Sequence, residues 1–269
     1  SAAVTQVVAC IDDIGNWMSS NRLKLNAEKA EFIWLGTRQQ LAKITRQPLD
    51  VGGSPVTPVN KVRDLGVMVD DELTMTVHVN HVVRSCFYQL RQQRSVRRCL
   101  PFEAQRTLVH AFVASRLDYC NAILYGVAAC HINRLQVVLN AAARLITGAG
   151  RREHITPVLR DVLHLLPVPQ RITFKIAVLA FDCVRGTGPT YFGDVCVPLA
   201  DIPGRANLRS AERGDLRVPS TTTVIGRRSF RVAAPTVWNS LPPHLRVKTL
   251  SRQQFRAGLK TYLFKAAYR

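Results

Sequence analysis

The feature that most constrains the fold is a row of apolar residues that recurs every three or four positions. Its members are Ile132, Leu135, Val138, Leu139, Ala142 and Leu145, and Gly148 and Gly150 follow directly. This spacing places every member on one face of an α-helix, and glycine commonly ends a helix. The same period predicts further helices at 4–20, 77–94, from Pro101 onward, 156–165, 172–183, 230–238 and 254–266. We therefore expect a mainly helical chain beyond about residue 76.

The first 70 or so residues have a different pattern. Glu31–Gly36 (E-F-I-W-L-G) is typical of a buried strand, and Val56–Val59 and Asp64–Val69 predict two short strands that flank Asn60-Lys61. Apolar residues make up 47% of the chain, which is enough for a sizeable core. The sequence predicts an α+β fold, with a small β-containing region followed by mainly α-helical ones. The stretch 198–223 is rich in Pro, Gly and Arg and predicts a long loop or linker.

Charge is unevenly distributed along the chain. There are 37 Lys+Arg against 18 Asp+Glu, for a formal net charge of +19. Residues 1–83 carry −1, residues 84–204 carry +8 and residues 205–269 carry +12. Such an excess predicts an acidic partner, with nucleic acid first and an anionic membrane surface second. Arginine supplies 29 of the basic residues, which suits phosphate and base contacts, although codon bias in a GC-rich genome is an equal explanation.

Cysteine use and apolar runs bear on the compartment. The seven cysteines are irregularly spaced and form no CxxC pair, so we expect a reduced intracellular environment, cytoplasmic and/or nuclear, rather than a disulfide framework. No run of 18 apolar residues occurs, so the sequence predicts no membrane span.

Few residue patterns suggest catalysis or metal binding. His78, His81 and Cys86 have a spacing that can hold zinc, but a fourth ligand has no obvious source. Asp12-Asp13 and Asp70-Asp71-Glu72 are better explained by a solvated helix face and a charged turn. The sequence contains no G-x-S-x-G, P-loop or G-x-G-x-x-G motif. From spacing alone we predict no active site and no metal site.

One basic stretch stands out. Arg84, Arg91, Arg94, Arg97 and Arg98 lie within 15 residues, with Phe87 and Tyr88 among them. On a helix, four of these arginines share roughly one face, which suits the tracking of a phosphate backbone. An ordinary solvated helix face is the alternative.

Six sequence segments, taken in their order along the chain, resemble those of a known protein family. They read I-G-N-W-M-S-S-N-R-L-K-L-N-A-E-K-A-E-F-I-W-L-G at 14–36, V-R-D-L-G-V-M-V-D-D-E-L-T-M at 62–75, S-R-L-D-Y-C-N-A-I-L-Y-G at 115–126, L-N-A-A-A-R-L-I-T-G at 139–148, R-S-F-R-V-A-A-P-T-V-W-N-S-L-P-P-H-L-R at 228–246 and F-R-A-G-L-K-T-Y-L-F at 255–264. Together they resemble the C-terminal portion of reverse transcriptases of LINE-type (non-LTR) retrotransposons, in the jockey-like group. The likeness covers essentially the whole chain.

The resemblance implies three regions. Residues 1–75 would be the end of the polymerase palm, 76–150 a helical thumb that clamps the template–primer duplex, and 151–269 a basic C-terminal extension. Lys29 matches a lysine proposed to assist the pyrophosphate leaving group, although this chain has Lys-Ala-Glu where the family usually has Lys-Thr-Glu. Leu65 and Gly66 would lie at the close-approach point of a hairpin that grips the primer.

The resemblance also bears on activity. Polymerase chemistry by two metal ions needs carboxylates, one of them from an aromatic-Ala-Asp-Asp turn that is not in this sequence. We expect no cofactor in this chain, magnesium ions in the intact parent polymerase, and no polymerisation by the chain alone. The sequence starts at Ser1 and is expected to be a fragment that lacks the upstream palm and fingers. Its partner would be an RNA/DNA template–primer duplex. The alternative is a degenerate or co-opted retroelement product that acts as a helical protein-interaction module.

Overall fold

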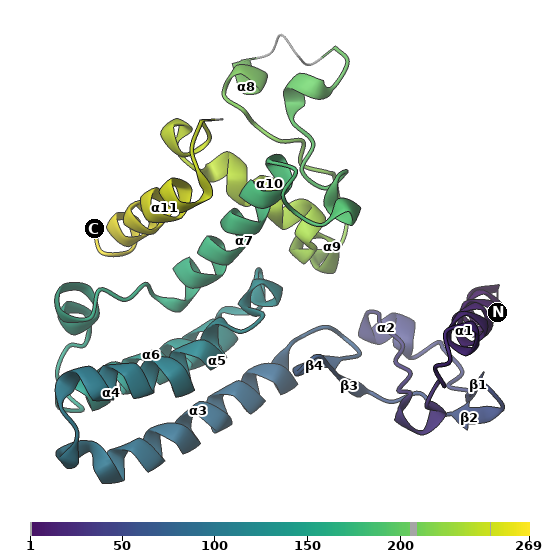
Figure 1. Cartoon of the computed structure of the whole chain (residues 1–269), viewed down its shortest axis with the longest axis horizontal. Helices are drawn as coiled ribbons and strands as arrows, with labels where there is room; N and C mark the ends of the chain where they lie inside the picture. The colour runs from purple at the N-terminus through teal and green to yellow at the C-terminus, as the bar shows by residue number, and fades with distance from the viewer. Residues whose placement is uncertain (1, 205–208, 248) are drawn as a thin grey trace. The chain divides into compact units, whose positions relative to one another are not determined.

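The chain folds into two compact units, Ser1–His78 and Val79–Arg269 (Figure 1). A computed structural model describes residues 2–204, 209–247 and 249–269. The first unit contains two small antiparallel sheets and the second is helical, which confirms the predicted α+β class. Among the helices of the described residues, none combines the length and the apolar character that a membrane crossing requires.

The first unit combines helices with two hairpins. Its elements are α1 (Ala2–Ser20), a 3-10 turn (Ala27–Lys29), α2 (Arg38–Leu41), β1 (Leu49–Val51), β2 (Ser54–Val56), β3 (Lys61–Asp64) and β4 (Val67–Asp70). β1 pairs with β2, and β3 pairs with β4, each antiparallel. Within this unit, part of the apolar face of α1 remains open to solvent, and the Trp17 side chain is 63% exposed.

Two strand predictions in this unit were wrong. Residues 31–36 form no strand: Phe32 makes a single bridge with Pro58, and the side chains are half-buried or exposed. A short apolar run does not by itself distinguish a strand from an ordered loop, because pairing depends on a neighbour elsewhere in the chain. The hairpin turn also lies at Leu65-Gly66 rather than at Asn60-Lys61, so Val56 ends β2 and residues 57–59 lead into β3.

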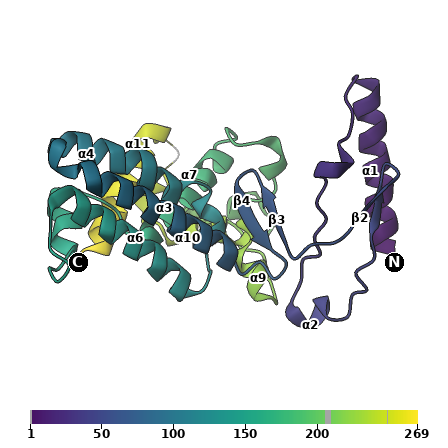
Figure 2. The ribbon, with the colours of Figure 1, turned by 90° about the horizontal axis from the view of Figure 1, so that it is seen from below.

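The second unit is built from helices. Beyond α3 (Thr76–Val96), which begins in the first unit, its helical elements are α4 (Phe102–Val109), a π-helical segment (His110–Ala114), α5 (Ser115–Asp118), α6 (Ala129–Thr147), a second π-helical segment (Val158–Val162), α7 (Val168–Val184), α8 (Arg209–Glu212), α9 (Val224–Arg228), α10 (Phe230–Ser240) and α11 (Arg252–Ala267). α4 lies beside α6 in both views (Figures 1 and 2). α6 ends where the sequence predicts: Gly148 has a φ of +78°, and its N–H donates to the Arg144 carbonyl at 2.8 Å.

An aromatic cluster holds the C-terminal helices onto α7. Phe181 of α7 stacks on Phe255 of α11 with ring centroids 4.4 Å apart, and Trp238 of α10 lies 6.0 Å from Phe255. The Trp238 indole N–H donates to the Gly214 carbonyl at 3.0 Å, so the buried ring carries no unpaired donor. The cluster thus joins the consecutive helices α10 and α11 to α7, from an earlier part of the sequence, in one core.

The predicted loop at 198–223 is tied to this core. The Asn239 side chain bonds to both backbone groups of Leu216, at 2.8 and 2.9 Å, and Leu216 is buried. Arg246 forms an ion pair with Asp215. The stretch also contains α8 and a 3-10 turn at Leu199–Asp201, so its described part is held by specific bonds.

The aromatic cluster gives the first testable prediction. Phe255→Ala should lower the free energy of unfolding of the second unit by about 3–5 kcal/mol, because it leaves a cavity between Phe181 and Trp238. Chemical denaturation followed by tryptophan fluorescence measures the loss. Val224→Ala is the control, because this exposed side chain should change stability by less than about 0.5 kcal/mol. Equal, small effects of both variants would contradict a packed cluster.

Candidate nucleic-acid interface

Helix α3 has one packed face and one solvent face. Val79 and Cys86 are fully buried on the packed side. Arg84, Tyr88 and Arg91 are spaced four and three residues apart on the opposite side, and all three are exposed. The tyrosine is 56% exposed and lies between the two arginines. The structure therefore brings two of the predicted arginines together with an aromatic ring, in an arrangement that can contact phosphates and stack on a base.

The remaining predicted arginines are placed differently. Arg94 is exposed on the flank of the same helix, and Arg98 is exposed in the 3-10 turn Arg97–Cys99. Arg97 turns towards protein: its Nε donates to the Leu145 carbonyl at 2.6 Å, at the C-terminal end of α6. A guanidinium there satisfies a carbonyl that the helix leaves unpaired and complements the helix dipole. Arg97 thus has a structural partner that the sequence did not reveal.

Helix α3 carries arginines without any acidic residue. No Asp or Glu occurs in α3, and none occurs in α6 or α11. Solvated basic faces commonly include opposite charges at i,i+3 or i,i+4. Within the described residues, Arg84, Arg91 and Arg94 form no ion pair. Their charges therefore face solvent uncompensated.

The two structural units differ sharply in charge. The first, residues 1–78, has 8 basic and 9 acidic side chains, for a net charge of −1. The second, residues 79–269, has 29 basic and 9 acidic side chains, for a net charge of +20. The positive potential is therefore a property of the helical unit.

Two of the three residues with zinc-ligand spacing, His78 and Cys86, make ordinary structural contacts instead. His78 is buried and its Nδ1 accepts from the Met68 N–H at 3.4 Å. Burial raises the pKa of the Cys86 thiol to about 11, against the opposing effect of Arg116, and its Sγ lies 3.9 Å from the Val113 carbonyl oxygen. His81 is exposed. In the part of the chain that the structure describes, no three His, Cys, Asp or Glu side chains cluster closely enough to hold a metal ion.

The residues predicted from the resemblance lie in the first unit. Lys29 is exposed at the end of the 3-10 turn, and the nearby Glu31 carboxylate accepts from the Arg63 N–H of β3 at 3.4 Å. The stretch around Lys29 is therefore linked to the hairpin whose tip carries Leu65 and Gly66.

The hairpin tip combines strain with exposure. Leu65 and Gly66 have φ values of +44° and +86°, and Leu65 is 84% exposed. Two consecutive positive φ values are what a type I′ turn requires. The β1–β2 turn meets the same requirement with Gly52 and Gly53, which adopt positive φ without steric cost. Leucine at such a position costs about 1–2 kcal/mol, so the second turn stores strain at an exposed apolar side chain.

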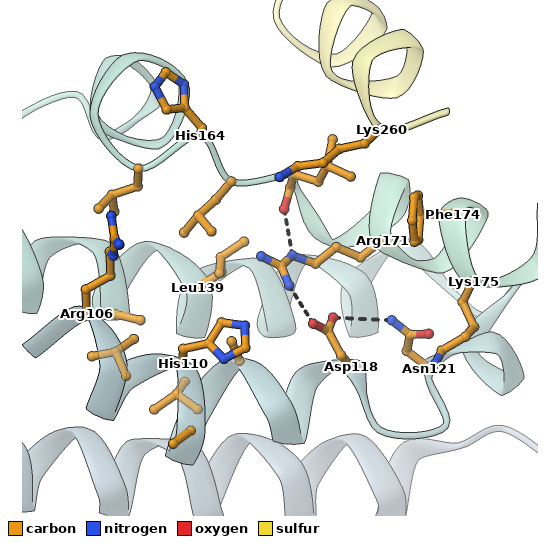
Figure 3. Close-up of a pocket in the computed structure, with 18 of the residues that line it drawn as sticks. Arg106, His110, Asp118, Asn121, Leu139, His164, Arg171, Phe174, Lys175 and Lys260 are labelled. Carbon is orange, nitrogen blue, oxygen red and sulfur yellow. Dashed lines mark hydrogen bonds and ion pairs between the residues drawn. The ribbon is translucent and has the colours of Figure 1, made fainter. Parts of the chain in front are cut away.

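The second unit also contains a pocket that the sequence did not reveal. The cavity measures about 870 Å³ and is formed by the end of α4, the segment His110–Ala114, α6, the loop at 163–166, α7 and α11 (Figure 3). Its interior is apolar, and its lining includes six Lys or Arg side chains against the single carboxylate of Asp118. The lining residues extend from Arg106 to Lys260, and periodicity within each segment does not predict that these segments meet.

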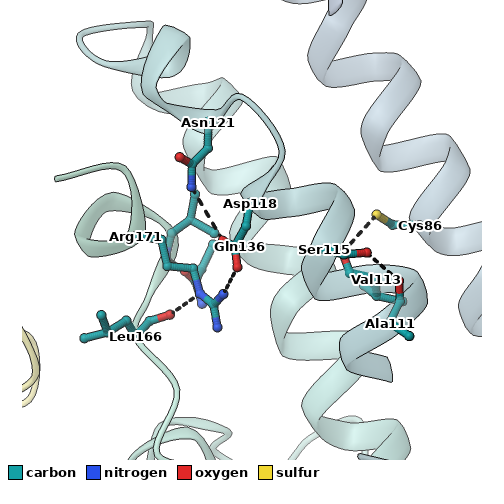
Figure 4. Close-up of polar contacts among 10 residues, drawn as sticks. Cys86, Ala111, Val113, Ser115, Asp118, Asn121, Gln136, Leu166 and Arg171 are labelled. Carbon is teal, nitrogen blue, oxygen red and sulfur yellow. Dashed lines mark hydrogen bonds and ion pairs between the residues drawn. The ribbon is translucent and has the colours of Figure 1, made fainter. Parts of the chain in front are cut away.

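A polar network shapes one wall of this pocket. Arg171 of α7 pairs with Asp118 at 2.7 Å and donates through Nε to the Leu166 carbonyl at 2.8 Å (Figure 4). Asn121 donates to the Asp118 carboxylate at 3.5 Å, and its own Oδ1 is buried without a hydrogen-bond partner. The segment at 115–126, which belongs to the resemblance, supplies both Asp118 and Asn121.

No protein-family model matches the chain, and neither curated protein sequences nor solved structures give a match.

The strained turn gives the second prediction. Leu65→Asn should stabilise the β3–β4 hairpin by about 1 kcal/mol, because Asn-Gly is a preferred type I′ pair. Hydrogen exchange of the β3 and β4 amides in the intact chain should slow about fivefold. Leu23→Asn makes the same chemical change at another exposed leucine and should leave the hairpin amides unchanged. Faster exchange in Leu65→Asn would show that the leucine side chain stabilises the turn.

Proposed function

We propose that this chain is the C-terminal portion of a retrotransposon RNA-directed DNA polymerase and binds template–primer nucleic acid. The second unit would carry the binding surface. The single observation that supports this function most strongly is the solvent face of α3, where Arg84 and Arg91 flank Tyr88 without a carboxylate on the helix. The ordered sequence segments that resemble LINE-type reverse transcriptases support the choice of polymerase family.

The chemistry of the α3 face favours a polyanion over a protein partner. Arginine presents a planar fork of donors that matches a phosphate group, and an exposed tyrosine offers a stacking surface that accepts any base. A helix that docks onto protein typically presents an apolar stripe instead. The four solvent-facing arginines Arg84, Arg91, Arg94 and Arg98 would each neutralise one phosphate.

The proposed activity is binding rather than polymerisation. The aromatic-Ala-Asp-Asp turn that supplies metal-binding carboxylates in the family does not occur in this sequence. We propose that Lys29 and the Leu65-Gly66 turn act near the primer end only when those carboxylates are present in the same active site. The chain alone should give no primer extension.

Salt dependence tests this proposal quantitatively. Neutralisation of four phosphates predicts that affinity for an RNA–DNA hybrid falls about 150-fold between 50 and 200 mM salt. Arg84→Ala/Arg91→Ala should reduce the slope of log affinity against log salt by about 1.8, because each phosphate contact contributes about 0.9. Fluorescence anisotropy of a labelled hybrid with a recessed primer end measures both slopes on the intact chain.

A matched control separates this face from net charge. Arg160→Ala/Arg231→Ala removes the same two charges, but these arginines pair with Asp161 and Asp194. Its slope should stay close to that of the unmodified chain. Equal losses in both double variants would contradict an interface on α3. Binding without a salt slope, or none below about 10 µM at low salt, would overturn the nucleic-acid function. A co-opted protein-interaction module would then be the better account.

A further inference from the structure

The pocket of the second unit has an apolar interior and a cationic edge. Val113, Leu139 and Ala142 are almost completely buried in its walls. Arg252, Arg256 and Lys260 line it from α11 at intervals of four residues, and Lys175 lines it from α7. In Figure 3 the Lys260 side chain extends from α11 towards the loop at 163–166, and Arg106 and His110 stand on the α4 side.

Three of the six cations that line the pocket are available to bind a ligand. Arg171 is held by Asp118, Arg252 by Asp182 and Arg106 by Glu103. Among the described residues, Lys175, Arg256 and Lys260 have no ion-pair partner, and all three are exposed. Like charges four residues apart on one helix, such as Arg256 and Lys260, are mutually destabilising. An anion bound between them would relieve that repulsion.

The size and interior of the pocket exclude a bare anion as its natural occupant. About 870 Å³ lies in the range of cavities that enclose small organic ligands, and inorganic phosphate would leave most of this apolar volume empty. The occupant should therefore combine an anionic group with a flat or apolar body.

A buried amide indicates what that body should present. Asn121 is 3% exposed, and its Nδ2 donates to the Asp118 carboxylate at 3.5 Å. Its Oδ1 is a buried acceptor without a donor, in a residue that lines the pocket, and such an arrangement is costly. An acyl chain offers no donor to such an oxygen. The exocyclic amine of an adenine or cytosine base does.

We propose that this pocket binds a nucleoside phosphate with an amino-bearing base. The base would enter the apolar interior beside Asn121, and the phosphate would bind between Arg256 and Lys260 of α11. A free nucleotide and the terminal nucleotide of a single strand share this chemistry. The proposal depends on the pocket alone and is independent of the α3 face.

Calorimetric titration of the intact chain tests this site with AMP as the probe. AMP should bind, adenosine about 10- to 100-fold more weakly because it lacks the phosphate, and IMP about tenfold more weakly because it replaces the amine by an oxo group. Asn121→Leu should abolish the preference for AMP over IMP. A 5′-phosphorylated adenosine dinucleotide that binds more tightly than AMP would identify a strand end as the source. Equal affinities would identify the free nucleotide.

Two further variants locate the site. Arg256→Gln/Lys260→Gln should weaken AMP binding about 10- to 100-fold, and Lys265→Gln/Arg227→Gln, which removes two exposed charges outside the pocket, should not. Ala111→Trp fills the pocket from its exposed wall and should abolish AMP binding while hybrid binding persists. Arg84→Ala/Arg91→Ala should leave AMP binding intact, so failure of one proposal is distinguishable from failure of the other.

Three results would overturn the proposal. The first is inorganic phosphate that binds as tightly as AMP, with no effect of Ala111→Trp, since this means surface anion binding. The second is dodecanoate that binds more tightly than AMP, since this means an acyl ligand. The third is AMP binding that both pocket variants leave unchanged.

Discussion

The arrangement of the second unit depends on the ion pair between Arg171 and Asp118. The pair lies at 2.7 Å and is mostly shielded on the arginine side. Arg171 also holds the Leu166 carbonyl, and the Gln136 side chain accepts from the Val168 N–H at 2.9 Å, so the start of α7 is fixed against both α5 and α6. Because loss of Asp118 would leave the mostly shielded Arg171 charge without its carboxylate partner, this junction is costly to open. The aromatic cluster then fixes α10 and α11 to α7, so the two groups of helices meet through α7.

Most acidic residues of the second unit form ion pairs with arginines of the same unit. Six of its nine carboxylates pair with an arginine of the same unit within the described residues. In the part of the chain that the structure describes, the carboxylates that stabilise the fold therefore leave α3 without an ion pair, and on α11 they pair only with Arg252. A unit with a net charge of +20 repels itself, and a bound polyanion reduces that repulsion while an ordinary neutral partner does not. The same charge distribution thus explains the exposed arginine face and the cationic edge of the pocket.

The sequence predicts the helices well because their signals are local. The apolar row of α6 and its Gly148 stop specify a helix without reference to any other segment, and the α11 capping box of Ser251 and Gln254 is equally local. The strand predicted at 31–36 failed because strand formation needs a partner that its own residues do not encode. In the sequence, Arg97 could not be distinguished from the neighbouring arginines, because only the folded chain brings the Leu145 carbonyl to it. The pocket was missed for the same reason, since its walls come from segments of the second unit that lie far apart in the sequence.

The segments that suggested a polymerase family have mostly structural tasks in the second unit. Asp118, in the block at 115–126, anchors α7 through Arg171, whereas Trp238 fills the aromatic core and Asn239 pairs with the backbone of Leu216. Residues with such tasks preserve a fold, and a fold does not by itself specify an activity. Function in this unit should therefore be sought in side chains that the fold does not use. Those side chains are the exposed cations of α3 and α11, together with the unpaired amide oxygen of Asn121.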